Sequence, residues 1–277
     1  MSILHAIVLG ITQGLAEFLP ISSSGHLLLV PWLFNWHDLG GDESLKKAFD
    51  VALHLGTLVG AVAYFRRDLV HYLREGLGGL RDRRHMSRDG RTAWLLVLSA
   101  VPAALAGALL DNQIEKLDDK IWLIAVLLIV FGLVLLWADR LIGTRRIESY
   151  SARDAIGMGA AQMLALQPGV SRSGMTITAG RFLGLDRDAA ARLSFLMSLP
   201  ITAGAGVYKL ADVLRHGGIP SELRGAFVAG MVSAAITGWI AVWGTLRFVR
   251  TRTFTPFVVY RVLAGVFVLA LLATGVR

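Results

Sequence analysis

Eight stretches of the sequence carry almost no charged residues, and this pattern restricts the fold more than any other feature. They lie at 3–34, 49–65, 93–110, 121–137, 155–180, 193–210, 225–246 and 256–275. A helix needs about 20 mainly apolar residues to cross the hydrocarbon core of a bilayer, and most of these stretches approach that length. Charged residues make up only 17% of the chain, against about 25% in an ordinary soluble domain. We therefore predict an all-α polytopic membrane protein, with residues 1–277 forming a single integral-membrane domain.

Two of the eight stretches are interrupted by polar residues and prolines. Residues 10–30 read GITQGLAEFLPISSSGHLLLV, and residues 157–180 have the same character. The 12 residues from Ser23 to Phe34 would form about 18 Å of helix, which is too short to cross a core about 30 Å thick. Non-helical backbone at membrane depth is tolerated only inside protein or beside a wet cavity. Each interrupted stretch is therefore predicted to be a re-entrant helix–loop–helix, and we expect the two stretches to meet and form one active site.

The order of these stretches repeats, since one interrupted segment is followed by three whole ones, twice over. Placing Gln13 on Gln162 also aligns three further pairs of identical residues, although the two prolines miss by one position. These pairs are Gly10 with Gly159, Ser24 with Ser173, and Gly25 with Gly174. We predict an internal repeat of about 1–139 and 150–277. If each half crosses three times, an odd number, the second half is inverted relative to the first.

The basic residues divide unequally between the two sets of connections. The connections 66–92, 138–154, 181–192 and 247–252 hold 18 Lys or Arg, and the opposite set holds 8. The longest of them, 66–92, is expected to be a solvated basic loop. The positive-inside rule places the richer set in the cytoplasm, with both termini outside, in the periplasm of a bacterial inner membrane. The net charge of +8 is then explained without a nucleic-acid partner. We expect membrane lipids as neighbours and leave a homodimer open.

Two simpler features exclude some alternatives. The chain contains no cysteine, which excludes disulfides, thiolate nucleophiles and cysteine-ligated metals. The segment from Met1 to Phe18 has neither a basic amino-terminal region nor a small-residue cleavage site, so we expect it to be retained structure rather than a signal peptide.

The first interrupted stretch offers oxygen ligands for a metal. Gln13 and Glu17 are four residues apart and share one helix face. A carboxylate and an amide oxygen suit a hard cation such as Mg²⁺ or Ca²⁺. The alternative is a buried Gln–Glu pair that only fastens two helices together.

Serines and glycines mark the predicted start of the second helix in each interrupted stretch. Serine is a preferred N-cap, and a helix N-terminus attracts anions. The phosphate-binding candidates are Ser22, Ser24 and Gly25 in the first stretch, and Ser171, Ser173 and Gly174 in the second. The alternative is that these residues only cap helices. Arg172 favours a phosphate-binding site, because a guanidinium at membrane depth is costly and its geometry matches phosphate.

Three further polar residues lie in apolar surroundings. His26, beside the serines, is a candidate acid, base or nucleophile. His54 is interpreted as a structural residue that hydrogen-bonds between helices. Arg261 either lines a cavity or extends outward to the membrane surface.

The two motifs resemble those of a known family. QGLAEFLPISSSGHL and PGVSRSG are similar to the two signatures of the bacterial undecaprenyl-pyrophosphate phosphatases of the bacitracin-resistance type, and FDVALHLGTL and RLSFLMSLPI extend the likeness along the chain. The resemblance implies two inverted repeats with re-entrant hairpins, dependence on a divalent metal, and undecaprenyl pyrophosphate as the lipid substrate. The implied reaction removes its terminal phosphate and returns the monophosphate carrier to cell-wall synthesis.

Roles carry over by motif position. Glu17 falls on the family's invariant carboxylate and Gln13 on its partner, where many members have Glu. Ser23 and His26 fall on the nucleophile and its proton-transfer partner, and which of the two attacks phosphorus stays open. Arg172, with the serines on either side, falls on the phosphate-binding motif.

A transporter is the alternative class of function. Inverted repeats with broken helices are also typical of secondary transporters, so the same site could bind an anionic polyprenyl phosphate lipid and flip it. The Ser23 and His26 pair favours the enzyme, because a transporter needs no nucleophile. A purely structural scaffold would leave Glu17 and Arg172 unexplained.

Overall fold

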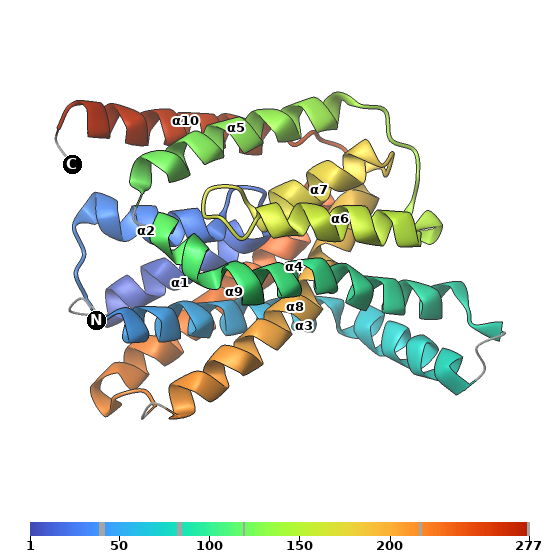
Figure 1. The fold of residues 1–277 in the computed structure, drawn as a ribbon, viewed down its shortest axis with the longest axis horizontal. Helices are drawn as coiled ribbons and strands as arrows, with labels where there is room; N and C mark the ends of the chain where they lie inside the picture. Colours follow the sequence, from blue (N-terminus) through green and yellow to red (C-terminus); the bar gives the residue numbers. More distant parts are fainter. Residues whose placement is uncertain (39–41, 82–84, 119, 216–217, 276–277) are drawn as a thin grey trace.

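The computed structural model describes residues 1–38, 42–81, 85–118, 120–215 and 218–275. The helices are α1 (Ile3–Phe18), α2 (Ser23–Phe34), α3 (Glu43–Arg81), α4 (Arg88–Asp118), α5 (Ile121–Arg140), α6 (Ala152–Leu164), α7 (Arg172–Phe182), α8 (Arg187–Arg215), α9 (Arg224–Val249) and α10 (Thr255–Ala273). Apart from two 3-10 turns and one isolated bridge between Arg145 and Leu185, the described regular structure is α-helical. The helices form one elongated bundle (Figure 1).

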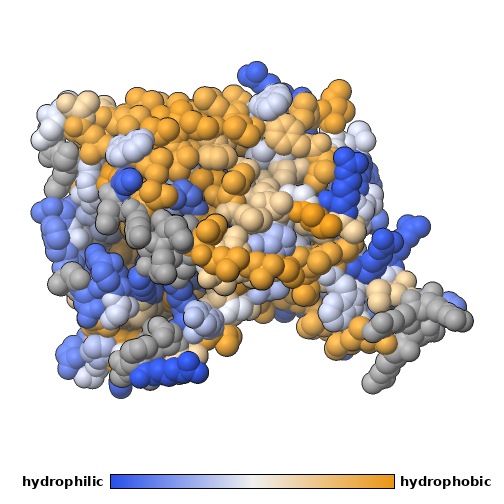
Figure 2. Space-filling model, viewed as in Figure 1, coloured by the Kyte–Doolittle hydropathy of each residue, from blue (hydrophilic) through white to orange (hydrophobic). Residues whose placement is uncertain are grey.

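Within the described residues, six helices, α3, α4, α5, α8, α9 and α10, are long and apolar enough to cross a membrane. Many of their large apolar side chains face outward, such as Leu109, which is 75% exposed. Figure 2 shows a broad hydrophobic surface over α5 and α10. A soluble monomer rarely exposes such an area. The prediction of an all-α, multi-pass membrane protein is therefore confirmed.

The helices extend further than the apolar stretches indicated. The connection 66–92 was expected to be a polar loop, but α3 continues to Arg81 and α4 starts at Arg88. Most residues there, including Leu, Arg and Glu, have good helix propensity, and propensity sustains a helix beyond the apolar region. The prediction of a long loop was wrong.

Both interrupted stretches form two short helices separated by a turn, as predicted. The turns contain Pro20 and Pro168, respectively. Ser22 and Ser171 adopt the same rare backbone conformation, each with φ of 78°. Each accepts a hydrogen bond from the amide three residues on, and so caps the next helix. The recurrence of this local design explains why the sequence pattern identified both breaks.

Glycines bring α1 against α9. A Cβ on Gly10 would lie 2.4 Å from the carbonyl oxygen of Gly230, and one on Gly14 would lie 2.6 Å from that of Ala234. A larger residue at either position would force the helices apart. Small residues four apart are a common means of close helix packing in membranes. This contact sets the position of the helix that carries Gln13 and Glu17.

The start of α6 is held by a separate ion pair. Arg145 donates two hydrogen bonds to Asp154, at 2.7 and 2.9 Å, and Ser151 and Asp154 form a capping box. Burial alone would raise the pKa of Asp154, but the hydrogen bonds from Arg145 and Ser151 outweigh it, and the pKa lies below its ordinary value. The second interrupted stretch is thus anchored at its beginning.

Candidate active site

The turns of the two interrupted stretches are in direct contact. The Ser22 hydroxyl accepts a hydrogen bond from the Gly169 amide at 3.0 Å, and the Ser173 hydroxyl donates to the Leu19 carbonyl at 3.0 Å. These residues are about 150 positions apart in the chain. The expectation that the two stretches meet is therefore confirmed.

Arg261, on α10, joins both turns to α5. It is fully buried, and its guanidinium donates to the carbonyls of Pro20 at 3.2 Å, Gly169 at 2.9 Å and Val170 at 3.0 Å. Its Nε donates to the carbonyl of Leu128 at 2.9 Å. Neither alternative drawn from the sequence holds, because the side chain neither reaches outward nor faces open space. Its role is to bind the backbone of the site together.

Glu17 is the centre of a buried polar cluster. Its Oε2 accepts hydrogen bonds from Ser23 Oγ at 2.6 Å and Gln13 Nε2 at 2.9 Å, and its Oε1 pairs with Arg172. Arg172 also donates to Thr202 on α8, at 2.7 Å. A buried carboxylate needs such partners, since unpaired burial of a charge is very costly. Four elements, α1, α2, α7 and α8, thus contribute to one cluster.

The start of α2 and the start of α7 converge on this cluster. Ser22 and Ser171 cap the two helices, and the amides of Gly25 and Gly174 donate to them at 3.4 and 3.1 Å. The hydroxyl oxygens of Ser171 and Ser173 are 3.3 Å apart. Ser24 is half-buried in the first turn of α2. Two helix N-termini side by side offer amide donors and positive dipole ends to an anion.

His26 has two protein partners of its own. Its Nδ1 lies 2.7 Å from the Ser22 carbonyl, which can only accept, so Nδ1 carries the proton. Its Nε2 lies 2.7 Å from the Tyr260 hydroxyl, which therefore donates to it in the neutral ring. The structure thus pairs Ser23 with Glu17 and His26 with Tyr260. The role assigned to His26 stays a prediction.

His54, interpreted from the sequence as structural, lies at the edge of the cluster. Its Nε2 is 3.7 Å from Glu17 Oε2, while its Nδ1 bonds to the Asp50 carbonyl of its own helix at 2.8 Å. The predicted hydrogen bond between helices is therefore not the one observed. A polar residue inside a long apolar helix was the available signal, but the sequence could not show which face of α3 meets α1.

The cluster fits a divalent metal in part. Gln13 Oε1 is buried and has no hydrogen-bond partner among the described residues, although Nε2 of the same amide contacts Glu17. Among the described residues no group of three His, Asp or Glu side chains could hold a metal. The protein would therefore supply few ligands and leave the rest to water and substrate oxygens, a common arrangement for Mg²⁺.

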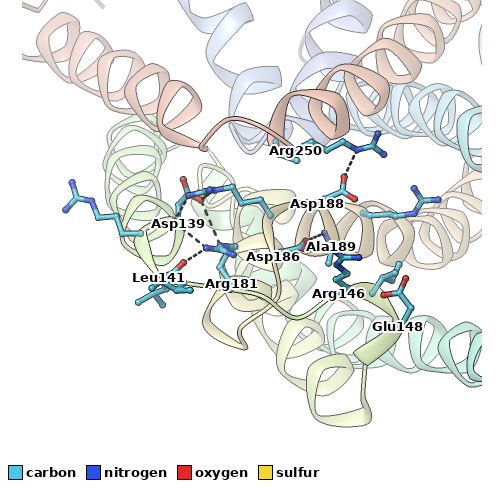
Figure 3. Close-up of a pocket in the computed structure, with 16 residues that line it drawn as sticks. Asp139, Leu141, Arg146, Glu148, Arg181, Asp186, Asp188, Ala189 and Arg250 are labelled. Carbon is cyan, nitrogen blue, oxygen red and sulfur yellow. Dashed lines mark hydrogen bonds and ion pairs between the residues drawn. The ribbon is translucent and has the colours of Figure 1, made fainter.

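A hollow of about 750 Å³ lies elsewhere, between the ends of α5 and α9 and the start of α8 (Figure 3). Asp139 there accepts hydrogen bonds from Arg187 at 2.5 Å and from the Phe254 amide at 2.9 Å, and Arg250 pairs with Asp188 at 3.2 Å. None of the predicted site residues lines it. Because Asp139 pairs with Arg187 and Asp188 pairs with Arg250 there, we interpret the hollow as a structural junction.

The fold and the site together define a multi-pass membrane protein with a buried Glu–Arg–Ser cluster where two interrupted helical segments meet. A family model described as bacitracin resistance protein BacA matches residues 6–267, and the chain belongs to that family. A relative from Geobacter sulfurreducens is 48% identical, with 98% of this chain and 99% of the relative covered. Relatives from Moorella thermoacetica and Pelobacter propionicus are 45% and 47% identical, with at least 98% of each chain covered. All three are named undecaprenyl-diphosphatase.

Proposed function

We propose that this protein hydrolyses undecaprenyl diphosphate to undecaprenyl phosphate and inorganic phosphate. The observation that carries the proposal is the buried cluster in which Ser23 donates to Glu17 and Glu17 pairs with Arg172, between two helix N-termini. Full-length relatives named for this activity share 44–48% of their residues with the chain. Transport of the same lipid is not favoured, because it requires no serine paired with a carboxylate.

The residues provide what phosphoryl transfer requires, namely positioning and stabilisation of negative charge. Arg172 and the amides at the starts of α2 and α7 bind the terminal phosphate. The Ser23 oxygen attacks its phosphorus while Glu17, 2.6 Å away, takes the hydroxyl proton. The bond from phosphorus to the bridging oxygen breaks, and undecaprenyl phosphate leaves. Water then hydrolyses the phosphoserine and releases phosphate.

A Mg²⁺ or Ca²⁺ ion would be held by Glu17 and the free oxygen of Gln13. When bound, it neutralises charge on the diphosphate oxygens. The unpartnered Gln13 Oε1 supports this assignment. The resemblance leaves a competing assignment open, in which His26, hydrogen-bonded to Tyr260, moves the Ser23 proton or attacks phosphorus in place of Ser23.

The same proposal includes an inverted topology in the bacterial inner membrane. α1, α2, α6 and α7 have 16, 12, 13 and 11 residues, each too short for a core about 30 Å thick. Both pairs are therefore re-entrant hairpins, one in each half. The start of α1 and the end of α10 lie at the same end of the bundle in Figure 1, which supports placing both termini on the same side of the membrane. The charge asymmetry of the connections supports assigning that side to the outside.

Phosphate release from C55 diphosphate by the purified protein, with and without EDTA, tests the proposal. We expect release that stops on chelation and returns when divalent metal is restored. Arg172→Lys should reduce it strongly, because an ammonium lacks the forked geometry of guanidinium. Arg250→Lys, which alters an exposed ion pair, is the matched control and should behave as the native chain does. Protein that is folded, metal-loaded and unable to release phosphate would refute the proposal.

A further inference from the structure

His54 lies beside Glu17, and a purely structural role does not explain the short separation between its ring nitrogen and the carboxylate. The separation between His54 Nε2 and Glu17 Oε2 is 3.7 Å, which is too long for a hydrogen bond. The His54 side chain is one-third exposed, whereas Glu17 is almost completely buried. His54 therefore approaches Glu17 from the more exposed side of the polar cluster.

The protonation of the ring follows from its other contact. Nδ1 lies 2.8 Å from the Asp50 carbonyl, one turn earlier on α3, and a carbonyl can only accept a hydrogen bond. Nδ1 therefore carries the proton, and in the neutral ring Nε2 presents a lone pair toward a carboxylate oxygen. In that neutral ring two acceptors face one another, an unfavourable arrangement that a cation shared between them would relieve.

The contact to Asp50 is itself typical of metal-binding histidines. Such residues nearly always donate their second ring N–H to a carbonyl, carboxylate or water, which holds the ring in place. His26 differs in this respect, because both of its ring nitrogens already have protein partners. Of these two histidines, only His54 has a ring nitrogen available to a ligand.

The distances agree with a shared ion. Metal bonds to nitrogen and oxygen of about 2.1 Å allow two ligands of one ion to lie up to about 4.2 Å apart, and 3.7 Å falls within that limit. The orphaned Gln13 Oε1 belongs to an amide that contacts the same Glu17 oxygen at 2.9 Å. The carboxylate of Glu17 and the imidazole nitrogen of His54 thus face one position, and the Gln13 amide lies beside the same carboxylate oxygen.

We propose that His54 is a ligand of the divalent metal, so that the site is a mixed nitrogen and oxygen site. The inference deepens the proposed function and rests on its metal. Imidazole is a poor ligand for Ca²⁺ and Mg²⁺, which prefer oxygen, and a better one for Mn²⁺, a first-row transition ion that accepts both oxygen and nitrogen. The site therefore binds Mn²⁺ more tightly than Ca²⁺, and His54 is the cause of the difference.

Mn²⁺ added to metal-free, full-length protein in detergent tests the proposal directly. Electron paramagnetic resonance measures free Mn²⁺ and hence Kd, and electron spin echo modulation detects ¹⁴N bonded to the ion. In the native chain we expect nitrogen modulation and a lower Kd for Mn²⁺ than for Ca²⁺. His54→Gln should abolish the modulation and raise the Mn²⁺ Kd at least tenfold, with less than a threefold change for Ca²⁺. His71→Gln, on the same helix but paired with Asp89, is the matched control and should keep both signals.

The outcomes separate this inference from the function on which it rests. Absence of nitrogen modulation in the native chain overturns the role of His54 without any variant, even if EDTA-sensitive phosphate release is normal. Modulation that persists in a folded His54→Gln protein overturns it as well. Failure of the native chain to release phosphate contradicts the proposed function instead, whatever the Mn²⁺ signal shows.

Discussion

Arg261→Lys should disrupt the site although it keeps the positive charge. The native guanidinium donates five hydrogen bonds to main-chain carbonyls, at 2.9 to 3.3 Å, and three of these carbonyls belong to the two turns. An ammonium has three donors and no planar fork, so at least two carbonyls lose their partner. Both turns would then be held less firmly against α5.

The magnitude follows from the cost of buried, unpaired polar groups. Each costs about 1–3 kcal/mol, so two cost about 2–6 kcal/mol. For a chain of this size about 1 kcal/mol lowers Tm by about 2–4 °C, and we therefore expect a fall of at least about 4 °C. A displacement of about 1 Å in the catalytic groups reduces the rate by about 100-fold, so activity should fall further than stability alone implies.

Thermal unfolding in detergent and phosphate release from C55 diphosphate, measured on the same preparation, provide the assay. Arg250→Lys is the control, because Arg250 is an exposed residue that makes one ion pair, at 3.2 Å, with Asp188. An exposed pair contributes about 0–1 kcal/mol, so both readouts should stay close to native. If Arg261→Lys changes Tm by less than about 1 °C and retains full activity, the proposed role of Arg261 is wrong.

Three further predictions address the metal, the topology and the chemistry. Glu17→Gln should leave the protein folded but abolish phosphate release; full activity at low divalent metal would remove Glu17 from the metal site. A cysteine introduced at Ser87 should be labelled only from the cytoplasm and one at Asn112 only from outside, and labelling of both from one side would overturn the inverted topology. Rapid quenching with terminally ³²P-labelled substrate should yield acid-stable, base-labile label at Ser23, whereas acid-labile label on a histidine would reverse the assignment of the nucleophile.

Local chemistry explains which features were predictable from the sequence. Hydropathy identified the membrane class, because a long apolar helix has few other stable environments. The two helix breaks could also be predicted from the sequence, since the serine and glycine after each proline-containing turn form a local cap for a new helix. Gln13 and Glu17 were grouped correctly because residues four apart on a helix are neighbours. Each of these statements depends on residues within a few positions of one another.

The tertiary structure alone decided how the polar residues are paired. His26 bonds to Tyr260, 234 residues away, and Arg261 reaches the turn at Pro20, 241 residues away. His54 approaches Glu17 because α3 packs beside α1, and no local pattern encodes that contact. A single buried polar side chain has many potential partners of equal chemistry along the chain. Helix packing selects the partner that each polar side chain finally contacts. That packing depends on close contacts throughout the bundle, such as that of Gly10 with α9, and not on any one motif.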